Sequence, residues 1–378
     1  MEQLFITNLI INKVRHLKDI SIPLSENQRK HLILTGKNGS GKTSVVECLA
    51  GCLNNIFTGK GERIFGNHPL DITFNNKTDN ILGLAEKYYY ILAYYRADRV
   101  FQAVQPKHVE KVELRDHYEL TEFPRNEFVK YLLDLKMTEA LSRNKNKTEK
   151  ANEIQVWFDK LENLLKQIFD DETVRLEFDE DTFEFYILQE GKEAFDFNTL
   201  SSGYQAVFDV VLDIMMRMQH QTQRTFVFNL SGIVIIDEMD AHLHLELQKS
   251  ILPFLTTFFP NIQFIVTSHS PFILNSIENV VIYDLENKIL VKHGLDNVPY
   301  DGIVEGYFKA DKLSDILKGK FERYRCLVAK KKLSDDELNE IAELELYLDE
   351  IPDYLAIDIA TEYQRMKIEF MNREDIDG

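Results

Sequence analysis

The residues whose chemistry is easiest to identify form a glycine-rich loop that ends in lysine and threonine. The loop follows an apolar run at 32–34, and its sequence is Gly36-Lys37-Asn38-Gly39-Ser40-Gly41-Lys42-Thr43. Backbone N–H groups in such a loop surround phosphate oxygens at a helix N-terminus, and the lysine adds a full positive charge. Lys42 is in position to contact phosphates, and the Thr43 hydroxyl to ligate Mg²⁺. The pattern predicts ATP and Mg²⁺ as ligands. The nucleotide-binding residues predicted in this stretch are Gly36, Asn38, Gly39, Ser40, Gly41, Lys42, Thr43 and Ser44.

Two acidic residues follow a second apolar run, where the predicted strand 233–236 ends. Ligands bind at the carboxyl edge of parallel sheets, so both carboxylates are expected beside the loop. Asp237 suits the magnesium shell, through water, and Glu238 suits the base that orients and polarises the attacking water. The predicted metal site therefore consists of Thr43 and Asp237.

A histidine ends a third apolar strand, Phe264-Ile265-Val266, within the polar cluster Thr267-Ser268-His269-Ser270-Pro271. An isolated histidine in such a place is most often structural. Its position one strand beyond the paired acids favours a role at the γ-phosphate and its water. Glu238 and His269 are thus the predicted catalytic residues.

A hydroxyl pair and a glycine, Ser201, Ser202 and Gly203, open a predicted helix at 202–218. Taken alone, this Ser-Ser-Gly sequence indicates a helix N-cap and nothing more.

The elements that must position these residues alternate between strands and helices, which indicates the α/β class. Strands are predicted at 32–34, 88–95, 225–228, 233–236 and 263–266, and helices at 43–53, 202–218 and 243–258. Short strands at 4–6 and 20–22 predict a β-rich N-terminal lobe. A helical insertion is predicted at about 100–170, interrupted by an exposed loop at 143–150, and a hairpin at 174–187.

The last part of the chain differs in kind because its pattern is helical only. Helices are predicted at 312–332, 335–350 and 353–371, with a capping box of Ser334 and Glu337 before the second. The predicted organisation is a head at 1–310 and a helical appendage at 311–378.

Composition excludes several classes of protein. The 378 residues carry a formal net charge of -18, so any DNA contact requires a local basic surface. Residues 312–332 hold eight Lys or Arg, and Lys330, Lys331 and Lys332 form their densest run. No stretch approaches the roughly 20 apolar residues of a membrane span, which predicts a cytoplasmic protein without a membrane partner. The three cysteines lack zinc-site spacing.

Taken together, the four motifs resemble those of the ABC ATPase superfamily, in which the start of the Ser201 helix is the signature sequence. The resemblance implies an ABC-type head and a homodimer that holds two ATP molecules between its subunits. It implies that Ser201, with Ser202 and Gly203, contacts the γ-phosphate held by the second subunit.

Over residues 1 to about 285, the motifs resemble the SMC and RecF branch more than transporter subunits. The run Val14-Arg15-His16-Leu17-Lys18-Asp19-Ile20 is similar to the segment in which a basic residue lies near the nucleotide base. This resemblance makes Arg15 a candidate, although an exposed arginine in a turn is an equally good interpretation. The stretch between Lys42 and Leu200 is too short for SMC-like coiled-coil arms.

Within that branch, the runs 237–244 and 267–271 most resemble the bacterial ATPases related to the OLD family, including the ATPase subunits of Septu-type and retron-linked antiviral systems. His242 and His244 then belong to a loop that crosses to the partner subunit, rather than to a metal pair. Three features depart from the pattern: Leu245-Glu246-Leu247-Gln248 after the histidines, Tyr204 in the signature, and no room at 311–378 for a Toprim nuclease domain.

The resemblance implies an ATPase that senses or regulates a separate effector, a nuclease or toxin, in antiviral defence. A RecF-like DNA repair ATPase is the alternative, with Lys330, Lys331 and Lys332 as its candidate DNA contact. A solvated helix face or a partner-binding site is the better interpretation of these lysines. A transport ATPase would require coupling to membrane domains, for which the sequence has no matching feature.

Overall fold

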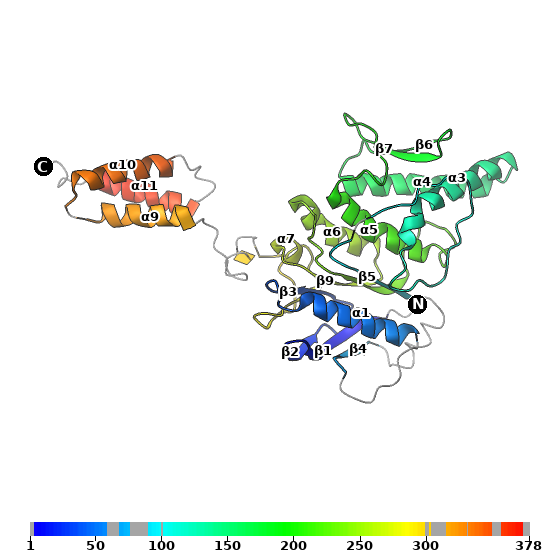
Figure 1. Ribbon diagram of the computed structural model, residues 1–378, viewed down its shortest axis with the longest axis horizontal. Helices are drawn as coiled ribbons and strands as arrows, with labels where there is room; N and C mark the ends of the chain where they lie inside the picture. The colour runs from blue at the N-terminus through cyan, green and yellow to red at the C-terminus, as the bar shows by residue number, and fades with distance from the viewer. Residues whose placement is uncertain are drawn as a thin grey trace. The chain divides into compact units, whose positions relative to one another are not determined.

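The computed structural model describes residues 4–58, 68–75, 90–99, 101–298, 302–303, 315–330, 332–349 and 357–372 (Figure 1). The chain divides into two compact units, Met1–Val298 and Pro299–Gly378, and each is described by itself. The sequence placed this boundary between 310 and 311, and those residues lie outside the described ranges.

A six-stranded sheet with the order β11-β10-β3-β9-β8-β5 forms the centre of the first unit. Five of these strands run parallel, and β11 pairs antiparallel with β10 at the edge. The strands are β3 (His31–Thr35), β5 (Tyr90–Tyr95), β8 (Ser231–Ile236), β9 (Ile262–Thr267), β10 (Val280–Asp284) and β11 (Ile289–Val291). Every residue of β3, β8 and β9 is buried, as expected for parallel strands covered on both faces.

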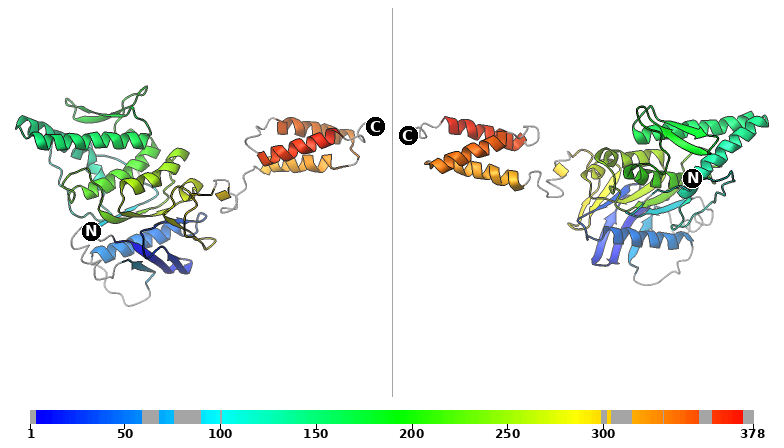
Figure 2. Two further views of the ribbon diagram at one scale, coloured as in Figure 1. Left: turned by 180° about the vertical axis from the view of Figure 1, so that it is seen from behind. Right: turned by 45° about the horizontal axis from the view of Figure 1, so that its top comes forward.

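Helices cover both faces of this sheet (Figures 1 and 2). On one face lies α1 (Lys42–Thr58), which buries Val45, Val46, Leu49 and Leu53 between the central sheet and the N-terminal lobe. On the other lie α5 (Ser202–Met218) and α6 (Leu245–Phe258). The N-terminal lobe is an antiparallel sheet of β1 (Ile6–Val14), β2 (Leu17–Pro23) and β4 (Leu70–Phe74), in the order β2-β1-β4.

The helical insertion begins with the short 3-10 helix η1 (Pro124–Glu127) and continues with α3 (Phe128–Asn144) and α4 (Thr148–Phe169). Residues 101–123 contain no helix, so the helices begin later than the predicted start near 100. The exposed loop predicted at 143–150 shrinks to a turn, since α3 and α4 are separated only by 145–147. The predicted hairpin is present as β6 (Arg175–Asp179) and β7 (Glu184–Leu188).

The strand predicted at 225–228 is wrong. This segment pairs with no strand, because its aromatic side chains pack on helices instead. The ring of Phe226 lies 5.3 Å from that of Trp157, and Phe228 lies 5.2 Å from Phe258, measured between centroids. A β-like pattern of alternating aromatics therefore reflects a packed loop here.

The second unit consists of α9 (Asp315–Val328), α10 (Asp335–Asp349) and α11 (Ile357–Met371) around a small core that includes Tyr324, Ile341 and Tyr363. The predicted capping box is present: the Glu337 backbone N donates to the Ser334 hydroxyl at 3.3 Å, and the Ser334 N to the Glu337 carboxylate at 3.1 Å. The α/β class, the β-rich lobe, the helical insertion and the helical appendage are all present, which confirms the predicted fold. Among the described residues, no helix combines the length and apolarity that crossing a bilayer requires.

Substitution of Gly232 tests how tightly β8, the strand before the two acids, is packed. A Cβ at this position of β8 would lie 2.7 Å from the Ile262 Cδ1 atom and closer still to the Ile91 carbonyl oxygen. Gly232→Ala is expected to lower the free energy of unfolding by about 1–3 kcal/mol through overpacking. Gly51→Ala in α1, where a Cβ would contact nothing, should raise it by about 0.5–1 kcal/mol. Urea denaturation measures the free energy of unfolding of both variants. An equal change in the two variants would contradict the close packing around Gly232.

Candidate functional site

The glycine-rich loop leaves the carboxyl end of β3 and turns into α1 through three glycines with positive φ. These angles are 130° at Gly36, 84° at Gly39 and 99° at Gly41. A Cβ at Gly41 would lie 2.9 Å from the Leu17 Cδ1 atom, and one at Gly36 would lie 2.9 Å from the Ser40 Oγ atom. Glycine is therefore required at 36 and 41 by backbone angle and by space together.

The lysine that ends the loop is folded back over it. The Lys42 side chain is 6% exposed, and its Nζ atom donates to the Gly36 carbonyl at 2.8 Å and to the Lys37 carbonyl at 3.2 Å. Burial lowers the pKa of Lys42, and the nearby Glu238 and Asp237 carboxylates oppose this shift. The ammonium group is thus held inside the loop, facing the two acids.

The two acids follow β8 directly, and a threonine at the end of β9 fixes them. The Thr267 hydroxyl donates to the Asp237 carboxylate at 2.6 Å and accepts from the Glu238 backbone N at 2.7 Å. Asp237 is buried, whereas Glu238 is half-buried and adopts a φ of 45°. One side chain on the neighbouring strand therefore orders both the carboxylate and the turn that follows it.

His269 follows the same strand two residues later and is half-buried. Its backbone N donates to the Asp240 carboxylate at 3.3 Å, and its Nε2 atom is buried without a hydrogen-bond acceptor among the described residues. Desolvation and the positive charge of Lys42 lower the pKa of this imidazole. The Nε2 atom is thus a buried ring nitrogen that has no partner in the described part of the chain, and His269 lines neither of the two pockets beside the loop.

A pocket of about 230 Å³, which we call the P-loop pocket after the glycine-rich loop (the P-loop), brings several of the predicted residues together. Lys42, Thr43 and Glu238 line it, although they come from α1 and from the turn after β8. Arg15, at the β1–β2 turn with a φ of 53°, lines the same pocket. The full lining is Arg15, His16, Asn38, Gly39, Gly41, Lys42, Thr43, Ser44 and Glu238.

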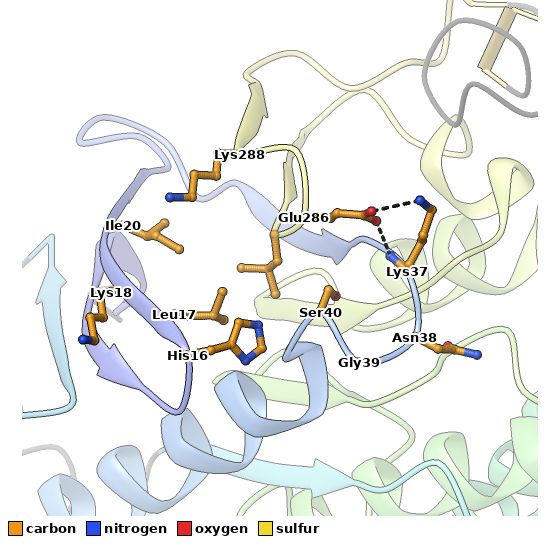
Figure 3. A pocket seen from close by; sticks show the side chains of 11 residues that line it. His16, Leu17, Lys18, Ile20, Lys37, Asn38, Gly39, Ser40, Glu286 and Lys288 are labelled. Carbon is orange, nitrogen blue, oxygen red and sulfur yellow. Dashed lines mark hydrogen bonds and ion pairs between the residues drawn. The ribbon is translucent and has the colours of Figure 1, made fainter.

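A second pocket, of about 440 Å³, shares the loop as one wall (Figure 3). His16 of the β1–β2 turn and Leu17 and Lys18 at the start of β2 form the opposite side, and the β10–β11 turn closes it. From that turn, the Glu286 carboxylate accepts from the Lys37 backbone N at 3.1 Å and pairs with the Lys37 Nζ at 3.0 Å (Figure 3). The loop is therefore anchored at its first residues as well as at its lysine.

The residues that open α5 do not line either pocket. Ser201 and Ser202 are exposed, and the Ser201 side chain makes no capping hydrogen bond. Gly203 is buried, and a Cβ there would lie 3.1 Å from the His242 carbonyl oxygen. His244 caps α6, since its ring nitrogen accepts from the Leu247 backbone N at 3.4 Å. The three signature candidates are thus separate from the P-loop pocket of the same chain.

Three residues that hold the site had no assigned role in the sequence analysis: Thr267, Glu286 and Arg99. Thr267 carried a signal, because a hydroxyl at the end of a strand beside the acids is well placed to bond them. Glu286 and Arg99 act on backbone groups far away in the sequence, and no local pattern identifies such contacts.

Thr267→Val removes the hydroxyl but keeps the shape of the side chain. It leaves the Asp237 carboxylate and the Glu238 N–H without this partner, so we expect the free energy of unfolding to fall by about 1–3 kcal/mol. Thr35→Val is the matched control, because the Thr35 hydroxyl is buried at the end of β3 without a hydrogen-bond partner among the described residues. Urea denaturation of both variants gives the comparison, and a loss in Thr35→Val as large as in Thr267→Val would contradict it.

Comparison with known proteins finds relatives of part of this chain. Residues 94–275 match the family model described as "AAA domain, putative AbiEii toxin, Type IV TA system". Among curated proteins, the Septu protein PtuA of Bacillus mycoides (strain KBAB4) is 34% identical over 39% of this chain and 21% of its own length. The "Retron Ec83 probable ATPase" of Escherichia coli is 30% identical over 38% of this chain and 27% of its own length.

The matched part thus spans only about a fifth to a quarter of these relatives. A solved SMC head bound to the C-terminal winged-helix domain of ScpA covers 78% of this chain and 100% of its own, at 15% identity and a TM-score of 0.41. That likeness is too low to carry an argument, and the fold assignment rests on the strand order. The family resemblance predicted from the motifs is nevertheless confirmed: the chain is related to a Septu protein and to retron ATPases, and its residues 94–275 match an AAA domain model.

Proposed function

We propose that the chain binds ATP with Mg²⁺ and hydrolyses it at a site shared by two copies, and that this turnover controls a separate effector in antiviral defence. The observation that carries the proposal is the pocket lined jointly by Lys42, Thr43 and Glu238. A phosphate-binding lysine, a hydroxyl suited to Mg²⁺ and a carboxylate suited to a base together match the needs of phosphoryl transfer to water.

The residues present fit a magnesium ion. The Thr43 hydroxyl and the Asp237 carboxylate supply oxygen donors, which Mg²⁺ prefers, and Thr267 holds the Asp237 carboxylate in one orientation. When bound, the ion would offset negative charge on the β- and γ-phosphates.

The chain's own groups then divide the remaining work. The Lys42 ammonium leaves its carbonyl partners and contacts the phosphates, together with the N–H groups of the loop. Glu238 accepts a hydrogen bond from the attacking water. This bond orients the water so that a lone pair of the water oxygen points towards the γ-phosphorus. His269, whose imidazole pKa is lowered by burial and by Lys42, would act on that water or on the γ-phosphate, as donor or acceptor according to tautomer.

The proposal of a shared site rests on what the pocket of one chain lacks. Ser201 and Ser202 are exposed, uncommitted and outside the pocket, as expected if they meet the ATP of a second copy. The resemblance to ABC ATPases supplies the head-to-tail arrangement. Two ATP molecules would then lie between the subunits.

Two observations support a separate effector, a nuclease or toxin. Relatives carry Septu and retron names, and the motifs resemble those of ATPases from such antiviral systems. The DNA-repair alternative has no specific support in the described residues. Lys330 pairs with the Glu337 carboxylate of α10, whose first turn also carries Asp335 and Asp336. The basic run is therefore partly neutralised within its own unit.

Lys42→Ala removes the only ammonium group lining the P-loop pocket of the described chain. Nucleotide affinity is expected to fall by about 30- to 150-fold, as the loss of a charge-assisted contact of about 2–3 kcal/mol implies. Isothermal titration with ATP and Mg²⁺ measures this. Lys13→Ala, at an exposed position of β1, is the control and should bind normally. Unchanged affinity in Lys42→Ala would refute the assignment of the loop.

Glu238→Gln keeps the shape of the side chain but removes its basicity. The turnover number is expected to fall by about 10²- to 10⁴-fold while ATP still binds. The variant should accumulate as a dimer with ATP but not with ADP, which light scattering after gel filtration detects. Glu246→Gln, at an exposed position of α6, is the control. Normal turnover in Glu238→Gln would remove Glu238 from the role of base.

A further inference from the structure

An arginine that lines neither of the two pockets described above holds the backbone turn that carries Glu238. Arg99 follows β5 and is 8% exposed. Its Nη1 atom donates to the Asp237 carbonyl at 2.8 Å, and its Nη2 atom donates to the Glu238 and Met239 carbonyls, both at 3.2 Å. Three successive carbonyls of one turn therefore share a single guanidinium group.

The turn needs such a partner because it leaves the sheet in an unusual conformation. Glu238 has a φ of 45°, a left-handed angle that residues with a side chain adopt rarely. The Glu238 carbonyl also accepts from the Ala241 backbone N at 2.9 Å, and Arg99 supplies a donor to all three carbonyls. The planar guanidinium carries several N–H donors in a fixed geometry, which suits it to bond more than one acceptor at once.

The turn is thus fixed from two directions. On one side Thr267 bonds the Asp237 carboxylate and the Glu238 N–H. On the other, Arg99 bonds the carbonyls. Glu238 can then rotate only about its own side-chain bonds, and its carboxylate is directed to the pocket that it shares with Lys42.

Arg99 also lies near a charged residue of α5, the helix that begins after Ser201. Asp209 of α5 is fully buried and lies close enough to Arg99 for each charge to act on the other. Asp209 also forms an ion pair with Arg125 of η1. Burial raises the pKa of Asp209 to about 6, opposed by Arg125 and Arg99. A buried negative charge on α5 therefore lies near the guanidinium group that holds the turn at 237–239.

We infer that Arg99 is a positioning residue for Glu238: it holds the turn at 237–239 so that the carboxylate faces the bound γ-phosphate. The inference rests on the proposed function in one respect, the role of Glu238 as base. Arg99 itself touches backbone carbonyls and no substrate. Its loss is expected to reduce the rate of hydrolysis and not the affinity for ATP.

The test compares Arg99→Gln and Arg99→Lys with Arg96→Gln, an exposed arginine of the same segment. For each protein, kcat and KM for ATP are measured per folded molecule, together with the Kd for a non-hydrolysable ATP analogue. Arg99→Gln should lower kcat by about 10- to 100-fold, the size of effect that a small misplacement of a reacting group produces. Its Kd should stay within about twofold. Arg99→Lys, whose single ammonium lacks the planar fork, should fall between, and Arg96→Gln should match the wild type.

A second comparison separates positioning from stability. When added to Glu238→Gln, Arg99→Gln should cause less than about a twofold further loss of kcat, because the group that it positions is already gone. A full additional loss would overturn the inference, as would a wild-type kcat in folded Arg99→Gln. If Arg99→Gln does not fold, the kcat of Arg99→Lys is the test. A wild-type kcat in Arg99→Lys would show that Arg99 contributes to stability alone, and so would failure of both variants to fold. Normal turnover in Glu238→Gln would instead refute the proposed function, and the two failures are distinguishable.

Discussion

The pairing of β9 between β3 and β8 is the constraint on which the site depends. Leu34 of β3 lies opposite Thr267 of β9, and Val266 lies opposite Ile236 of β8. The three strands therefore end at the same level of the sheet, and the phosphate-binding loop, the paired acids and the histidine leave from one edge. A shift of one residue in the register between β8 and β9 would move Thr267 away from the Asp237 carboxylate and reverse the faces of the buried side chains.

Around that edge, most of the contacts that hold the site in place are hydrogen bonds between side chains and backbone groups. Few of them join one reactive side chain to another. Lys42 bonds two carbonyls of its own loop, Glu286 bonds the N–H of Lys37, and Arg99 bonds the carbonyls that flank Glu238. The Glu238 and His269 side chains remain free of such bonds among the described residues. The result is a rigid frame around groups that are still available to a ligand.

The sequence was sufficient where chemistry and local pattern coincide. The P-loop and the acids at the end of β8 follow apolar runs, and the hydroxyl pair Ser201 and Ser202 marks the start of the helix after it. It was misleading at Phe226 and Phe228, because aromatic alternation is the same for a strand and for a loop packed on Trp157 and Phe258. Arg99 and Glu286 were beyond reach for another reason: their partners are backbone groups more than 100 residues away.

The central claim is that the ATP site is completed by a second copy of the chain, and mixing two inactive variants tests it most directly. Lys42→Ala loses the P-loop lysine, whereas Ser201→Glu places a negative charge where the partner's γ-phosphate would lie. After subunit exchange at equal amounts, each mixed dimer carries one intact shared site. We predict that the mixture recovers about a quarter of the wild-type ATPase rate, since half of the dimers are mixed and one of their two sites works. A mixture that stays as inactive as its parts, or a Ser201→Glu variant that is fully active alone, would contradict the shared site.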